Sequence, residues 1–112
     1  MSSGSDRIVR RRGAVLGTLS EAQRDWHALR TGSCKATALP LPVVVVLETC
    51  ERGDATLTRF DAAGDFCGNT WHASESAAES QARVEFGDAL GEWTTIPEGA
   101  EPVEHLLRER EA

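Results

Sequence analysis

The chain is 112 residues long, 40% hydrophobic and 27% charged, with a net charge of −6. This length predicts one domain with a modest core, and no stretch approaches the ~18–20 apolar residues of a membrane-spanning helix. Cys34, Cys50 and Cys67 form no CxxC pair, which argues against a disulfide framework and a zinc site. We therefore expect a cytoplasmic protein with reduced thiols.

The charge is divided unevenly along the chain. Residues 1–35 carry seven basic and three acidic side chains, a net +4, whereas residues 36–112 carry five basic and fifteen acidic ones, a net −10. The polar, arginine-rich start predicts a disordered basic tail over residues 1–18. An acidic domain repels nucleic acid and anionic membranes, so only this tail could contact them.

Residues 19–42 are predicted to hold a helix and a linker. Ser20 and Gln23 fit a capping box that starts a helix at about residue 20, and Gly32 is suited to end it. Pro40 and Pro42 favour an extended linker over 32–42.

Three strands and two turns are predicted next. Residues 43–49 include four consecutive valines and a leucine, a run typical of a central strand that is covered on both faces. The strand at 55–61 alternates, with Leu57 on one face and Phe60 on the other. In the strand at 66–72, Gly68 indicates a bulge.

The remaining elements are two helices and one strand. A helix starts at Ser74 or Ser76 and ends at Gly87, with Ala78, Ala82 and Phe86 forming a narrow apolar face. A strand near 92–96 and a helix over 102–111 complete the pattern. The predicted fold of residues 43–112 is a small α+β domain. It has a three-strand antiparallel meander plus one further strand, packed by a helix, with an N-terminal helix and a short C-terminal helix.

Several short motifs in this region resemble those of a group of small bacterial domains of unknown function. They cover about half of the chain and are Arg59-Phe60-Asp61, Gly64, Gly68-Asn69-Thr70-Trp71-His72, Glu85-Phe86-Gly87, Trp93 and Pro97. The resemblance implies a folding unit and no particular activity.

The segment Asn69, Thr70, Trp71 and His72 is the first candidate site, because it leads into a helix N-terminus. Trp71 is interpreted first as a core anchor. The alternative is a contact anchor on an exposed interaction site. Asp54, Asp61 and Asp65 lie near hairpin ends and are interpreted as turn residues that bind backbone amides.

Two further candidate sites are weaker. Cys67, Cys50 and His72 could form a thiol or metal site, but five residues along one strand separate Cys67 from His72 by about 16 Å. The cluster Arg7, Arg10, Arg11 and Arg12 could contact nucleic acid, although no aromatic residue is interleaved with it.

The leading hypothesis is a non-catalytic interaction or accessory module that binds an unknown protein partner or a second copy of itself. It predicts no enzyme activity, catalytic residue, metal or other cofactor, and no membrane partner. The alternatives are a small thiol- or metal-dependent enzyme and a nucleic-acid-associated regulator that acts through the N-terminal arginines.

Overall fold

The computed structural model describes residues 7–30 and 41–111 of the chain. The elements, in chain order, are β1 (Ile8–Val15), α1 (Glu21–Arg30), β2 (Val44–Cys50), β3 (Ala55–Phe60), β4 (Phe66–His72), α2 (Glu75–Phe86), η3 (Gly87–Ala89), β5 (Thr94–Thr95) and α3 (Pro102–Glu111). The predicted linker falls mostly outside the described residues. No helix within the described ranges has both the length and the apolar character needed to cross a membrane.

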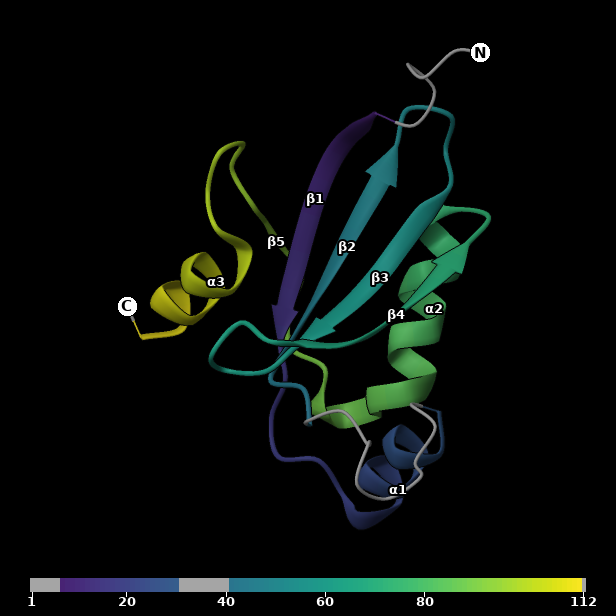
Figure 1. Ribbon diagram of the computed structural model, residues 1–112, viewed down its shortest axis with the longest axis vertical. Helices are drawn as coiled ribbons and strands as arrows, with labels where there is room; N and C mark the ends of the chain where they lie inside the picture. Colours follow the sequence, from purple (N-terminus) through teal and green to yellow (C-terminus); the bar gives the residue numbers. More distant parts are fainter. Residues whose placement is uncertain (1–6, 31–40, 112) are drawn as a thin grey trace.

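The fold is α+β, as predicted, with one antiparallel sheet and helices on both of its faces (Figure 1). The strand order is β4-β3-β2-β1-β5, so five strands form the sheet rather than the expected four. The short β5 pairs with β1 and not with the β2-β3-β4 meander. Helix α2 packs on β2, β3 and β4, whereas α3 packs on β1 and β2.

Strand β1 corrects the prediction of a disordered tail over residues 1–18 for the part from Ile8 to Val15, and residues 1–6 lie outside the described part of the chain. It pairs with β2 along nearly its whole length and lies inside the sheet. Ala14 on β1 and Leu16 just after it are buried in the core with residues of α2. The arginines give this segment the composition of a disordered chain. In the structure, Arg10 and Arg12 bind acidic side chains and Arg11 binds a backbone carbonyl, all far along the sequence. The first element in the described part of the chain is therefore a strand and not a helix.

The valine-rich strand is covered on both faces, as its composition predicts. Val45 and Leu47 belong to a core under α2, together with Ala78, Ala82 and Phe86. Val44 and Val46 belong to a second core under α3, together with Ile96, Val103 and Leu106. Because successive side chains of a strand point to opposite faces, this one run supplies both cores.

Local backbone signals place several element ends. Gly68 has a φ of 111°, and the β3–β4 register shifts beside it, which confirms the predicted bulge. The Ser74 hydroxyl accepts a hydrogen bond from the Ala77 amide and caps α2. Ser20 and Gln23 form the expected capping box at the start of α1, and the Gln23 side chain also donates to the Phe86 carbonyl at 2.7 Å, which attaches α1 to the end of α2.

One charged pair lies inside the α2-side core. Arg59 follows Ala55 and Leu57 on the same face of β3, and its guanidinium contacts the Glu85 carboxylate on α2. Their side chains are 0% and 1% exposed. Arg59 also donates to the Leu57 carbonyl at 2.8 Å and to the Thr70 hydroxyl at 3.1 Å. These bonds compensate for much of the cost of removing the two charges from water.

We predict that Glu85→Ala lowers the free energy of unfolding by about 3–5 kcal/mol, because it leaves the buried Arg59 charge uncompensated. The double variant Arg59→Met/Glu85→Leu removes both charges and should be more stable than Glu85→Ala. Urea denaturation of the three proteins measures this. The exposed pair Glu104–Arg108, at 3.0 Å on α3, provides the control, since Glu104→Ala should cost less than about 1 kcal/mol. A double variant as unstable as Glu85→Ala would contradict the argument.

Candidate interaction surface

The outer half of the sheet leaves one face without a helix. Thr56 and Thr58 of β3 point away from α2, because their neighbours Ala55 and Leu57 are buried under it. Across the strand pair, Thr56 lies opposite Trp71 and Thr58 lies opposite Asn69. Helix α3 covers β1 and β2 on this side (Figure 1). We define the Trp71 face as the outward-facing residues of β3 and β4 on this side: Thr56, Thr58, Phe66, Asn69 and Trp71.

Two large apolar side chains on the Trp71 face are in contact with solvent. Trp71 is 63% exposed and Phe66 is 49% exposed. Asn69 is exposed, and the two threonines are half-buried. All five side chains are uncharged, although the chain carries a net charge of −6. Aromatic side chains are enriched in protein interfaces.

The Trp71 indole is held in one orientation by hydrogen bonding. Its Nε1–H donates to Asp54 Oδ2 at 2.7 Å. Arg52 donates to both oxygens of the same carboxylate, at 2.9 and 3.2 Å. Hydrogen bonds from Arg52 and Trp71 lower the pKa of Asp54 to about 2. The ring is therefore both accessible and oriented before any partner arrives.

The turn interpretation holds for Asp61, whereas the partners of the Asp54 side chain include a residue distant in the sequence. The Asp61 side chain accepts from the amides of Ala63 and Asp65, at 3.0 and 2.9 Å. Asp54 instead supports Trp71, seventeen residues later in the chain. The sequence held no local signal for this contact, since it depends on the pairing of β3 with β4.

The structure divides the candidate segment between the two faces of the sheet. Asn69 and Trp71 lie on the Trp71 face, whereas Thr70 and His72 lie on the side of α2. His72 Nε2 is 2.7 Å from the Thr70 hydroxyl. Burial, followed by the nearby Arg59 charge, lowers the pKa of His72. The interpretation of Trp71 as a core anchor is wrong, because the bulge at Gly68 and the strand register turn its ring outward.

The thiol of Cys67 is not prepared for nucleophilic chemistry. Cys67 is buried, its Sγ contacts the Asp65 carbonyl at 3.4 Å, and burial raises its pKa to about 11. Thiolate chemistry at neutral pH needs a lowered pKa. Cys50 is half-buried, and Cys34 lies outside the described residues. Within the described ranges, no three His, Cys, Asp or Glu side chains gather closely enough to hold a metal ion.

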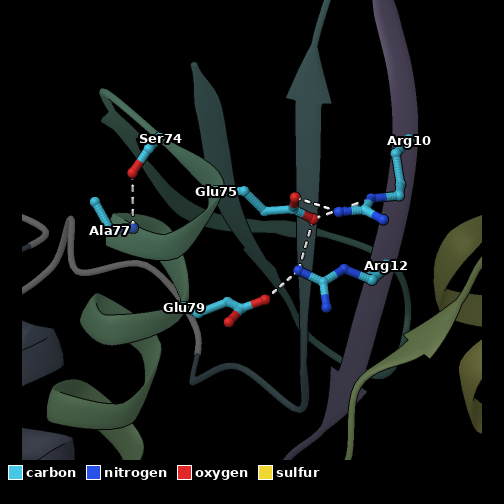
Figure 2. Close-up of polar contacts among 6 residues, drawn as sticks. All are labelled: Arg10, Arg12, Ser74, Glu75, Ala77 and Glu79. Atoms are coloured by element: carbon cyan, nitrogen blue, oxygen red, sulfur yellow. Dashed lines mark hydrogen bonds and ion pairs between the residues drawn. The ribbon is translucent and has the colours of Figure 1, made fainter. Parts of the chain in front are cut away.

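Three of the four arginines of the candidate nucleic-acid site, Arg10, Arg11 and Arg12, lie on β1, and Figure 2 shows two of them, Arg10 and Arg12. Arg10 and Arg12 point toward the first turn of α2, where Glu75 binds both and Glu79 binds Arg12. Arg12 also lies 5.6 Å from the centre of the Trp93 ring. These contacts attach β1 to α2 and occupy two of the four cations.

The other two arginines of that group, Arg7 and Arg11, make different contacts. Arg11 donates to the carbonyls of Pro97 and Ala100, at 3.4 and 3.3 Å. Arg7 precedes β1, and its carbonyl accepts from the Glu51 amide at 2.8 Å. The four arginines therefore do not form one continuous patch.

Comparison of the chain with protein-family models, curated proteins and solved structures finds no match. The resemblance to small bacterial domains stays a prediction, and the site has to be interpreted from its own geometry.

The Asp54 contact predicts a pH dependence. The folded carboxyl has a pKa of about 2 against an ordinary value of 3.8, so its stabilising contribution is present above the ordinary value. It is lost as the pH falls through about 2. The NMR shift of the Trp71 indole N–H should therefore titrate with a midpoint near 2 and should lose this transition in Asp54→Asn. A midpoint near 3.8 would show that the contact is absent in solution.

The buried thiol gives a second prediction. In a variant that keeps only Cys67, reaction with a disulfide reagent at pH 8 should be on the order of 100-fold slower in the native protein than in urea, because burial and a raised pKa suppress the thiolate. A variant that keeps only Cys50 is the matched control and should react faster in the native state. Equal native and denatured rates at Cys67 would contradict the prediction.

Proposed function

We propose that the chain is a non-catalytic protein-binding module whose contact surface is the Trp71 face. The observation that carries the proposal is an indole that is 63% exposed and yet held by a 2.7 Å hydrogen bond to a carboxylate that is itself bound by Arg52. Tryptophan is enriched among the residues that contribute most to interface affinity. An oriented side chain loses little conformational freedom when a partner covers it.

The surroundings of Trp71 indicate the chemistry of the partner. Phe66, at the other end of β4, provides a second apolar contact, and Asn69 provides an amide between them. A complementary surface would offer a pocket for the indole and few charges, since the five residues of the face are neutral. A second copy of the chain meets this requirement, so self-association is the first case to test.

The two alternative functions, a thiol enzyme and a nucleic-acid regulator, have less support than a binding module. A thiol enzyme would need an accessible thiolate, whereas Cys67 is buried with a raised pKa. A nucleic-acid regulator would need cations that are available to phosphates, whereas Glu75 binds Arg10 and Arg12. The proposal of a binding module needs neither.

The test compares Trp71→Ala with Val84→Ala. Val84 is 81% exposed on α2, so its replacement removes exposed apolar area away from the Trp71 face. We expect Trp71→Ala to weaken association by about 30-fold or more, as for an interface residue worth at least ~2 kcal/mol, and Val84→Ala to have little effect. Sedimentation velocity over a range of concentrations measures self-association.

A photo-crosslinking residue at position 58 then reports on other partners in cells, with the same residue at position 84 as the control. Specific crosslinks from position 58 that Trp71→Ala removes would support the proposal. A chain that stays monomeric and gives the same crosslinks from both positions would overturn it.

A further inference from the structure

A second surface lies at the other end of the sheet, where β1 extends beyond its outer neighbour. β5 pairs only with Arg12 and Gly13 of β1, and the last contact on this side is the Ile96 amide with the Arg11 carbonyl at 2.9 Å. Pro97 follows and has no amide hydrogen to continue the ladder. The outer edge of β1 is therefore unpaired over residues 8–10 among the described parts of the chain.

The same stretch of β1 remains firmly attached on its inner side. Ile8 pairs with Cys50, and the Arg7 carbonyl accepts from the Glu51 amide at 2.8 Å. β2 therefore holds this stretch in the sheet, with a shift of the β1–β2 register between Ile8 and Arg10. An extended backbone that docks there would meet a template that is already formed.

A groove of about 430 Å³ accompanies this edge. Residues 7–11 form one side of it, and Thr95, Ile96 and Glu98 form the other. In Figure 1, the chain after β5 turns away from β1 and leads to α3. Ile8 and Val9 are 45% and 55% exposed, so the groove combines an open strand edge with apolar side chains.

The groove is basic on a protein that is acidic overall. Arg7 and Arg11 line it together with Glu98, while Arg10, which also lines it, has its charge paired with Glu75. Arg11 donates to two carbonyl oxygens, which are neutral, so its full positive charge stays at the wall of the groove. At physiological ionic strength, charges farther away than about 8 Å are largely screened. Among the residues that line the groove, the unpaired charges of Arg7 and Arg11 therefore exceed that of Glu98.

We infer that this groove binds an extended acidic peptide that pairs with the outer edge of β1 as an additional strand. Backbone hydrogen bonds to residues 8–10 would supply affinity, and acidic side chains would face Arg7 and Arg11. At ~3.3 Å per residue, the stretch from Ile8 to Arg11 accommodates about four peptide residues. This site is separate from the Trp71 face and does not depend on the proposed function.

The experiment uses the full chain and labelled peptides in fluorescence anisotropy. The probe is a peptide of alternating valine and glutamate, and the comparison peptides replace glutamate by lysine or carry N-methylated backbone amides. We expect the acidic peptide to bind about tenfold or more tightly than either. NMR shifts on binding should map to Ile8, Val9 and Thr95.

Matched variants locate the site. Arg7→Glu should weaken binding by about tenfold, whereas Arg108→Glu, which makes the same charge change on α3, should leave it nearly unchanged. Trp71→Ala should also leave it unchanged, which separates this site from the Trp71 face. Circular dichroism of each variant confirms that it is folded.

Three outcomes would overturn the inference. Equal binding of the N-methylated peptide would show that no strand is added. Preferential binding of a single-stranded DNA oligomer would indicate phosphate recognition in place of strand pairing. If the chain self-associates and the associated form no longer shows Arg7-dependent peptide binding, the edge would be assigned to a second copy of the chain.

Discussion

The burial of β2 on both of its faces is the constraint on which the rest of the structure depends. Val44 and Val46 face one side of the sheet, and Val45 and Leu47 face the other, all four essentially without solvent exposure. A strand with apolar side chains on both faces needs a layer on each side and a neighbour at each edge. Helices α2 and α3 supply the layers, while β1 and β3 supply the neighbours.

Helix α3 covers only part of its face of the sheet. α2 and α3 meet the sheet on opposite faces, and α3 packs on β1 and β2. The half of the sheet made by β3 and β4 is therefore open on the α3 side, which places Trp71 and Phe66 in contact with solvent. At the far end, the two-residue β5 is too short to cover β1. Both proposed surfaces follow from this unequal coverage.

Charged side chains hold the layers together where apolar contacts are few. The aromatic content is low, at 5% of the chain, and the α2 core consists mainly of small and aliphatic residues. The Arg59–Glu85 pair fixes α2 on β3, and Arg10 and Arg12 fix its first turn on β1. The buried Arg59–Glu85 pair favours one arrangement of helix on sheet, because a shifted helix would leave its charges unpaired.

Features that depend on local chemistry could be predicted from the sequence alone. Alternation and turn glycines placed β3 and β4, and the Ser74 cap and Gly87 placed α2. The valine run predicted a strand that is covered on both faces. Each of these signals lies within a few residues of the element that it predicts, so no knowledge of distant contacts was needed.

Only the tertiary structure decided the rest. The arginines of β1 indicate disorder by composition, but Glu75, sixty-five residues after Arg10, binds both Arg10 and Arg12. Trp71 was expected inside, but the bulge at Gly68 and the pairing of β4 with β3 turn it outward, where Asp54 holds it. Arg59 occupies a core-facing position of the alternating strand β3, although its charge alone would predict exposure. In each case a partner distant in the sequence changes the cost of placing a polar or apolar group, and no local pattern carries that information.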